Sequence, residues 1–387
     1  MGEHATFPTN MSQPPVPILD LKRQYQNLMP QVLEALGQVL DSGAFVLGPD
    51  VAAFEKEIAS WMEAPHAVGV SNGTDALFIA LRALGIDRGD QVLSSPFTFF
   101  ATVSATVNSG ATPVFSDIDP QTFNLDPNQV EDLLKKDKKR AIKAIIPVHL
   151  YGQASDMQAF KVLSEKFGVF LIEDACQAIG ANIEGIKAGN WSSFGCFSLY
   201  PTKNLGAIGD AGFMVTSDGK LAEKARAIRN HGSHKRYFHE MIGSNFRMDT
   251  LQAAALRIFL RHLDQWIELR QKAASFYDEH LSKVEEIRIP KRAAFSTHTF
   301  HQYTIRVLNG KREALQSHLS KNQIAHMVYY PIPCHLQEAL KPLDYRTGDF
   351  PNAERASLEV LSLPIFPGIT EEELGRVVSC IDSFFKS

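Results

Sequence analysis

Two hydrophobic rhythms alternate along the first two thirds of the chain. Short apolar runs, which suit strands buried on both faces, are followed by stretches with the three-to-four-residue spacing of an amphipathic helix. The apolar runs predict strands at residues 67–70, 91–94, 112–115, 144–148, 169–172, 193–199 and 211–216. The helical spacing predicts helices at residues 25–40, through Phe54 and Trp61, and at 76–84 and 101–108. This alternation predicts an α/β fold with a mostly parallel sheet covered on both faces.

The rhythm changes after Thr250. One long amphipathic helix is expected over residues 251–281, followed by strands near 302–307 and helices near 313–321 and 371–384. We therefore expect a large domain over residues 17–250 and a smaller α+β C-terminal domain over 251–387. Residues 1–16 lack the apolar core of a signal peptide and are expected to form a loose leader.

The composition is that of a globular protein. The 387-residue chain is 44% hydrophobic and 21% charged, and its formal net charge is −4. This balance gives no electrostatic reason to expect a nucleic-acid partner. No apolar run is long enough to span a bilayer, so no membrane partner is expected. The basic run at residues 135–140 is interpreted as the solvated end of a helix.

The cysteines match neither a zinc site nor a disulfide framework, because no C-x-x-C pair occurs. The simplest interpretation is a reduced, cytoplasmic protein without a metal site. The four cysteines are Cys176, Cys196, Cys334 and Cys380.

A lysine among apolar and small residues gives the strongest chemical signal. Lys203 follows Ser198 in the run FSLYPTKNLG, and Asp174 follows the apolar run at 169–172. This combination suits pyridoxal phosphate (PLP). A lysine amine can hold the aldehyde as a Schiff base, and a carboxylate can pair with the protonated pyridine nitrogen. The alternatives are a solvated surface lysine and an Asp that caps a helix; the apolar neighbours of Lys203 argue against the first.

Other polar and aromatic residues at strand ends suit the same cofactor. Gly73 and Thr74 lie between a strand and a helix, where backbone N–H groups and a hydroxyl form either an anion site or a plain helix cap. The Ser198 hydroxyl is placed to bind phosphate. Phe99 is a candidate for stacking on a pyridine ring, with core packing as the alternative. Gln177 is a candidate to reach the phenolic oxygen, with a polar surface position as the alternative.

Several segments, in order, carry a family resemblance. They are SNGTDAL, PFTFFAT, HLYGQ, EDACQAIGA, FSLYPTKNLGAIGDAG, RNHG and GSNFRMDTLQAAAL. Together they resemble the DegT/DnrJ/EryC1/StrS family of PLP-dependent nucleotide-sugar aminotransferases, over residues 18–384. The resemblance implies the type I aminotransferase fold and a homodimer with shared active sites. It also implies pyridoxal 5'-phosphate as cofactor, with L-glutamate and a keto-sugar nucleotide as substrates.

The resemblance assigns roles to individual residues. Lys203 matches the Schiff-base lysine, which also moves the proton between the substrate carbon and the cofactor carbon. Asp174 matches the partner of the pyridine nitrogen, and Gln177 matches the residue near the ring oxygen. Cys176 is expected against the other ring face. The kinetics are expected to be ping-pong.

The phosphate side of the site is implied to come from two chains. Gly73, Thr74 and Ser198 match phosphate ligands, and Phe99 falls where the family places a ring-stacking aromatic. Asn245, in the segment GSNFRM, matches an asparagine that reaches the phosphate of the neighbouring subunit.

The same motifs bear on the substrate. The run YPTKNLGAIGDAG is similar to the branch that aminates 3-keto sugars on dTDP, whereas the 4-keto branch more often has Glu at the position of Asp210. A dTDP-3-keto-6-deoxyhexose is therefore expected, with a 4-keto sugar nucleotide as the alternative. For each histidine the alternative is a hydrogen-bonded loop residue. The candidate substrate-side residues are His149, Tyr151, His231, Lys235, Tyr237, His326, Tyr329, Tyr330 and His335.

The presence of Lys203 bears on the other functions that proteins with this fold can have. Deoxysugar dehydratases of the family replace the lysine with His, which argues against that chemistry here. A PLP-dependent aldolase or decarboxylase stays open, because spacing alone does not exclude one. A non-catalytic regulatory protein on the same fold is the alternative from a different class. The presence of Lys203, Asp174, Ser198 and Thr74 argues against it.

Overall fold

A seven-stranded sheet forms the centre of the larger domain in the computed structural model, which describes residues 14–235 and 237–386. The strand order is β1-β9-β8-β5-β4-β2-β3, and β9 runs antiparallel to both of its neighbours while the other pairs are parallel. Each strand coincides with a predicted apolar run, which confirms the mostly parallel sheet. The strands are β1 (His66–Val70), β2 (Gln91–Ser94), β3 (Thr112–Phe115), β4 (Ile142–Ile146), β5 (Phe170–Asp174), β8 (Phe194–Ser198) and β9 (Gly212–Thr216).

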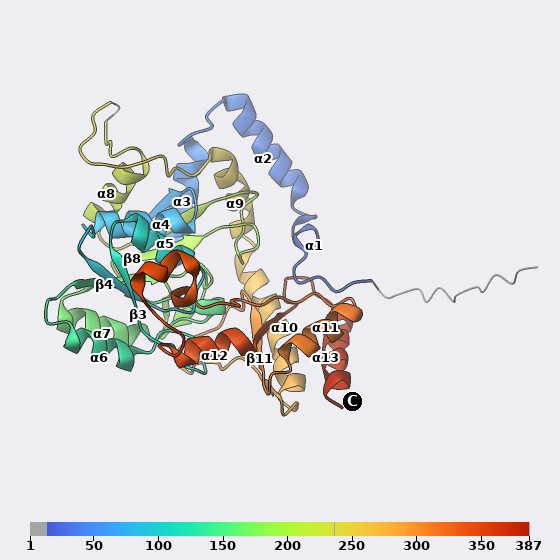
Figure 1. Cartoon of the computed structure of the whole chain (residues 1–387). Helices are drawn as coiled ribbons and strands as arrows, with labels where there is room; N and C mark the ends of the chain where they lie inside the picture. The colour runs from blue at the N-terminus through green and yellow to red at the C-terminus, as the bar shows by residue number, and fades with distance from the viewer. Residues whose placement is uncertain (1–13, 236, 387) are drawn as a thin grey trace, which may run out of the picture.

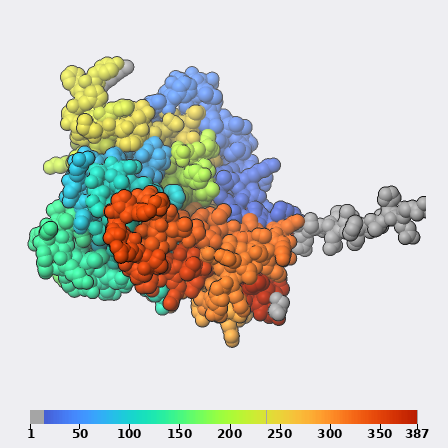
Figure 2. Space-filling model, viewed as in Figure 1, coloured from blue at the N-terminus to red at the C-terminus, as the bar shows by residue number. Residues whose placement is uncertain are grey.

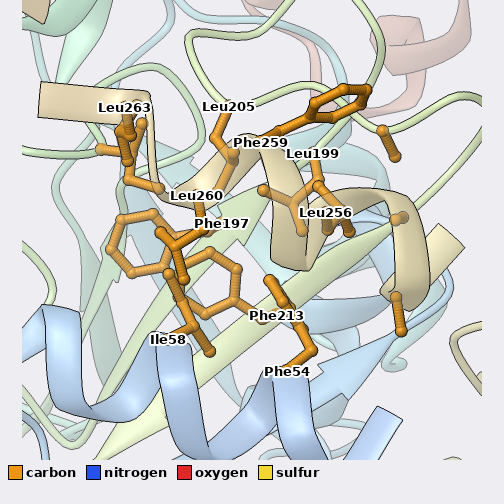
Figure 3. Close-up of a cluster of buried hydrophobic side chains, with 14 of the residues drawn as sticks. Phe54, Ile58, Phe197, Leu199, Leu205, Phe213, Leu256, Phe259, Leu260 and Leu263 are labelled. Atoms are coloured by element: carbon orange, nitrogen blue, oxygen red, sulfur yellow. The ribbon is translucent and has the colours of Figure 1, made fainter. Parts of the chain in front are cut away.

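Helices cover both faces of this sheet because its strands carry apolar side chains on both sides. These helices are α3 (Pro49–Met62), α4 (Gly73–Ala83), α5 (Ala101–Asn108), α6 (Pro127–Lys136), α7 (Met157–Phe167), α8 (Gly219–Arg229) and α9 (Thr250–Leu260). Phe197 and Phe213 pack with α3 and α9, as Figure 3 shows. Cys196 and Met214 alternate to the opposite face and join a second cluster with residues of α4 and α8.

The hydrophobic spacing does not predict α6, α7 and α8. In α8 the reason is that the buried side chains are mainly alanines, which contrast little with the polar positions. In α6 the apolar residues do lie on one face, but they are few, and only Val130 and Leu134 are buried. The basic run at 135–140 lies at the C-terminal end of α6 and is largely exposed, as expected.

The single long helix expected over residues 251–281 is wrong. The chain forms α9 up to Leu260 and a separate helix, α10 (Leu263–Leu281), with a break at Arg261 and His262. The change of core comes within α10 and not at this break. Leu263, Trp266 and Ile267 still pack in the same cluster as α9, whereas the later turns, such as Tyr277, pack in the cluster of the smaller domain. No Gly or Pro marks this break in the sequence.

The smaller domain contains an antiparallel three-stranded sheet of order β10-β11-β12. Figure 1 shows α10, α11 and α13 gathered on this side of the molecule, away from the large sheet. Its elements are α10, β10 (Ile287–Arg288), β11 (Tyr303–Val307), α11 (Arg312–Lys321), α12 (Pro351–Glu359), β12 (Val360–Leu363) and α13 (Glu371–Lys386). Of these, β10, α12 and β12 are not predicted by the spacing of apolar residues.

The remaining elements are short or lie at the N-terminal side. They are α1 (Leu21–Tyr25), α2 (Met29–Ser42) and the hairpin of β6 (Asn182–Ile183) with β7 (Ile186–Lys187). Most of the leader expected at 1–16 lies outside the described residues, but Val16 is buried and pairs with Ile324. None of the helices within residues 14–235 and 237–386 is both long enough and apolar enough to cross a membrane.

Candidate active site

A cavity of about 680 Å³ lies at the carboxyl ends of β5 and β8, where the two domains meet. The sheet domain supplies Gly73, Thr74, Asp174, Ser198 and Lys203 to its wall. Segments that follow α9 supply the opposite wall, with Arg270, His301, Gln302, Tyr329 and Tyr330. The structure thus brings together most of the predicted cofactor residues at the end of the sheet where open α/β folds bind ligands.

Lys203 lies in a tight turn just after β8. Its N–H donates to the Tyr200 carbonyl oxygen at 2.8 Å, and a Cβ on Gly206 would overlap the Pro201 carbonyl oxygen, so the turn needs glycine there. The Lys203 Nζ lies 3.5 Å from His301 Nε2. Burial lowers the pKa of Lys203, and the nearby Cys176 and Asp174 only partly oppose this. The enclosed amine is therefore easier to deprotonate than one on the surface.

Asp174 closes β5 at the floor of the cavity, where its side chain is buried. Its Oδ2 accepts a hydrogen bond from Thr102 Oγ1 at 2.7 Å, and its Oδ1 accepts one from the Cys176 N–H at 3.2 Å. Thr102 Oγ1 is in turn 3.0 Å from Thr98 Oγ1. The hydrogen bonds from Thr102 and Cys176 hold the carboxylate in one orientation. A carboxylate needs such a fixed orientation if it is to pair with a ring nitrogen.

The N-terminus of α4 forms an anion cradle with Ser198. Asn72 caps the helix by accepting the Asp75 N–H at 2.9 Å, and the first-turn N–H groups have no carbonyl partner within a helix. A Cβ on Gly73 would lie 2.7 Å from Ser198 Cβ and 2.8 Å from Cys176 Sγ. Only glycine therefore lets the helix start come this close to β8. The cavity therefore combines a helix-terminal cradle, a buried carboxylate and an enclosed lysine.

Gln177 is fixed from both sides at the cavity wall. Its Oε1 accepts the Tyr151 N–H at 2.8 Å, and its Nε2 donates to the Tyr330 hydroxyl at 3.1 Å. Phe99 also lines the cavity; its side chain is 58% exposed, and its ring centre lies 6.1 Å from that of Tyr330.

The predicted substrate-side residues divide into two groups. Tyr329 and Tyr330 line the cavity, and the buried Tyr151 donates its hydroxyl to the Tyr329 carbonyl oxygen. His149 and His335 do not line it. His149 is buried with its Nε2 at 2.9 Å from Glu173, and His335 pairs with Glu354 at 3.1 Å. His326 likewise lies outside the lining, with its Nδ1 3.2 Å from the Ile324 carbonyl oxygen.

Four further candidates lie on the segment between α8 and α9, which does not line this chain's cavity. Lys235 Nζ is 4.9 Å from the centre of the Phe238 ring, and Tyr237 follows in the same loop. Asn245 is exposed and pairs with Asn230. The loop stands out from the body at one end of the molecule (Figures 1 and 2), and His231 lies at its start.

Three polar residues at the site, Thr102, Arg270 and His301, were not predicted from the sequence. Thr102 lies behind Asp174, at the second position of α5, within the segment PFTFFAT already singled out from the sequence. Arg270 could have been found from the sequence, because a charged residue interrupts the apolar face of α10 that Trp266, Ile267 and Tyr277 form. His301 precedes β11 and has no periodic signal.

The comparison with known proteins decides the family. The sequence profile of the DegT/DnrJ/EryC1/StrS aminotransferase family matches residues 27–382. The chain belongs to this family. The resemblance, the type I fold and the aminotransferase class expected from the motifs are thereby confirmed. Within the described residues, no group of three or more His, Cys, Asp or Glu could hold a metal ion.

Similar proteins cover nearly the whole chain. A pleiotropic regulatory protein of Geobacillus stearothermophilus is 46% identical, over 96% of this chain and 99% of its own. A UDP-N-acetyl-3-dehydro-alpha-D-glucosamine 3-aminotransferase of Acidithiobacillus ferrooxidans is 41% identical, over 95% and 97%. A dTDP-3-amino-3,4,6-trideoxy-alpha-D-glucose transaminase of Streptomyces venezuelae is also 41% identical, over 95% and 96%.

A solved structure matches the fold closely. The crystal structure of S. venezuelae DesV in complex with a ketimine intermediate has a TM-score of 0.93 and 41% identity to this chain. The match covers 97% of this chain and all of that one. Fold and family therefore agree across both domains.

Proposed function

We propose that this aminotransferase uses PLP to move an amino group from L-glutamate to a keto-sugar nucleotide. The observation that carries the proposal is the enclosed Lys203 in a cavity that also holds the buried Asp174 and the helix-terminal cradle at Gly73. Each of these three groups suits a different part of the cofactor: the aldehyde, the ring nitrogen and the phosphate.

The chain's residues fit this cofactor as follows. The N–H groups at Gly73 and Thr74, with the Ser198 hydroxyl, would hold the phosphate. Asp174 would pair with the ring nitrogen, and Gln177 would reach the ring oxygen from its fixed position between Tyr151 and Tyr330. The exposed Phe99 ring would stack on the pyridine.

When bound, PLP supplies an aldehyde carbon that amines capture and a ring that takes up the electron pair released at the substrate carbon. The protein supplies the proton transfers. Lys203, released when an incoming amine takes its place, would take the proton from the substrate carbon and return it to the former aldehyde carbon of the cofactor, on the other side of the nitrogen that joins the two carbons. Burial favours its neutral form, which is the form that accepts a proton.

We propose that the active form is a homodimer. Asn245, Lys235 and Tyr237 lie on a protruding loop, from which they would reach the cavity of the partner subunit. Exposed apolar side chains on α2, on the segment after it and on this loop support a contact surface. They are Leu33, Leu40, Phe45, Val46, Leu47, Phe238 and Ile242. Four unpaired cysteines fit a cytoplasmic location.

For the acceptor we favour a dTDP-linked 3-keto-6-deoxyhexose. Support comes from the 200–212 run and from the similar transaminase of S. venezuelae, whose name places its amine at C3 of a dTDP sugar. The A. ferrooxidans relative, also a 3-aminotransferase by name, carries its sugar on UDP. By their names, both relatives place the amine at C3 of the sugar, whereas the nucleotide that carries the sugar differs.

The test is single turnover of the aminated protein with 3-keto and 4-keto sugars on dTDP and UDP, with products identified by NMR. An amine at C3 of the dTDP sugar is expected. Reaction only with 4-keto sugars would overturn the regiochemistry. The regulatory alternative is favoured by the name of the 46% identical relative. It predicts no glutamate-dependent reaction with any sugar in the panel, although the sugar nucleotides would still bind.

A further inference from the structure

His301 approaches Lys203 from the opposite wall of the cavity. Its Nε2 lies 3.5 Å from the Lys203 Nζ, and both side chains face the cavity while protein encloses them on the other sides. Lys203 belongs to the turn after β8, whereas His301 lies two residues before β11 of the smaller domain. The contact therefore joins the lysine turn to the other domain.

The backbone that carries His301 is held in place by Arg270. This side chain is 1% exposed, and its Nη1 donates to the carbonyl oxygens of Phe300 at 3.2 Å, His301 at 3.3 Å and Ile365 at 3.0 Å. Burial lowers the pKa of Arg270 to about 10, which leaves it cationic at neutral pH. The backbone at His301 is thus fixed by hydrogen bonds from Arg270, which limits the positions that the imidazole ring can take.

The charges around His301 favour a neutral imidazole. Burial, with the cations Lys203 and Arg270 on two sides, lowers the pKa of His301 well below its ordinary value. A neutral imidazole has one donor nitrogen and one acceptor nitrogen. It can accept from a lysine ammonium, and in its other tautomer it can donate to a lysine amine. The His301 Nδ1 has no protein partner, so no neighbouring group fixes the tautomer.

We propose that His301 is a positioning residue for Lys203: its imidazole keeps the lysine nitrogen turned toward the cavity in both protonation states of that nitrogen. The proposal rests on the proposed function, in which Lys203 is released and must act as a base. A carboxylate at this position would instead hold the ammonium form and oppose proton abstraction. A histidine avoids that effect while keeping a hydrogen bond.

The test follows covalent uptake of PLP by the cofactor-free protein. In this step the Lys203 nitrogen replaces the aldehyde oxygen, which leaves as water, and reduction with borohydride fixes the bond for mass spectrometry. Uptake needs the neutral amine, so its rate in the wild type should rise with pH through the pKa of Lys203 and then level off. Asp174, Cys176 and Arg270 also face this pair and stay unchanged in all variants.

Two variants separate positioning from packing. H301D adds a carboxylate beside the amine and should move the rising part of the profile to higher pH by about one unit or more. H301F removes the hydrogen bond at similar size and should lower the plateau about tenfold or more, because the nitrogen loses its orientation. His280→Gln on the outer part of α10 serves as the matched control and should leave the profile unchanged.

The outcomes are distinct. Absence of any uptake at Lys203 by the wild type would reject the proposed function itself. Uptake by the wild type with identical profiles in H301D and H301F would overturn the role of His301 and leave the proposed function standing. Circular dichroism and Tm establish that each variant is folded. Should H301F not fold, His301→Leu, which also removes the hydrogen bond, takes its place in the comparison of plateaus.

Discussion

Thr102 Oγ1 donates a 2.7 Å hydrogen bond to Asp174 Oδ2, across a separation of 72 residues. The bond ties the start of α5 to the end of β5, and Thr98 extends it at 3.0 Å from Thr102. A hydroxyl that donates to a buried carboxylate fixes its direction and stabilises its charge. The orientation of Asp174 is therefore set by α5, the helix between β2 and β3, as well as by its own strand.

Replacing Thr102 with Val should weaken cofactor retention and lower kcat/KM. The hydrogen bond is to a charged group, so its loss is worth about 1.5–3 kcal/mol, or about tenfold or more. The dissociation of the cofactor from the loaded protein, followed by absorbance, and the steady-state rate measure the two effects. Thr102→Ser keeps the hydroxyl and is the control. Equal retention in Thr102→Val and the wild type would show that the bond is incidental.

Asp174→Asn should slow transamination by about a hundredfold or more, while the protein still folds and binds the cofactor phosphate. An amide cannot carry the negative charge that holds a ring nitrogen protonated. Single-turnover rates with glutamate measure the loss. A loss below about threefold would leave Asp174 with only a structural role at the end of β5.

The fold was predictable where strands are buried on both faces. Each of the seven strands of the large sheet contains a short apolar run, and β2 and β3 match their predicted bounds. The crossover helices α4 and α5 were predicted as well, but α8 was not, because it faces the sheet mainly with alanines and gives little contrast between its apolar and polar positions. The break at Arg261 was not predictable for another reason: no Gly or Pro marks it, and apolar residues on both sides of it, such as Leu260 and Leu263, pack in the same cluster.

The site was predictable where one residue type alone suits the chemistry. Lys203, Asp174 and Ser198 all line the cavity as the motifs indicated. The histidines were harder to interpret, since a buried His such as His149 satisfies Glu173 as readily as it would a ligand. His301 escaped notice because its partner, Lys203, is 98 residues away and no local pattern marks the contact.

Mixing two inactive variants should restore activity if sites are shared between subunits. Lys203→Ala removes the lysine, and Asn245→Asp places a negative charge where the phosphate of the partner's cofactor is proposed to lie. A hybrid dimer keeps one site with both native residues, so up to about half of the wild-type activity per hybrid is expected. Mass spectrometry confirms that chains have exchanged. Exchange without recovery would place Asn245 at its own chain's site.

Acid should destabilise the fold partly through His298. Its Nδ1 accepts the Phe300 N–H at 3.0 Å, and burial, with Arg292 nearby, lowers its pKa from 6.5 to about 3. Between pH 6.5 and about 3, His298 is therefore protonated in the unfolded chain but neutral in the folded one. Its contribution to the free energy of unfolding is fully present above pH 6.5 and is lost as the pH falls below that value. Between pH 7 and 5 the loss should be about 2 kcal/mol.

His298→Asn keeps an acceptor for the Phe300 N–H but does not titrate, although it loses stacking on the Phe300 ring. Its Tm deficit at pH 7 should therefore shrink as the pH falls to 5. A constant deficit across that range would show that His298 does not contribute to acid sensitivity.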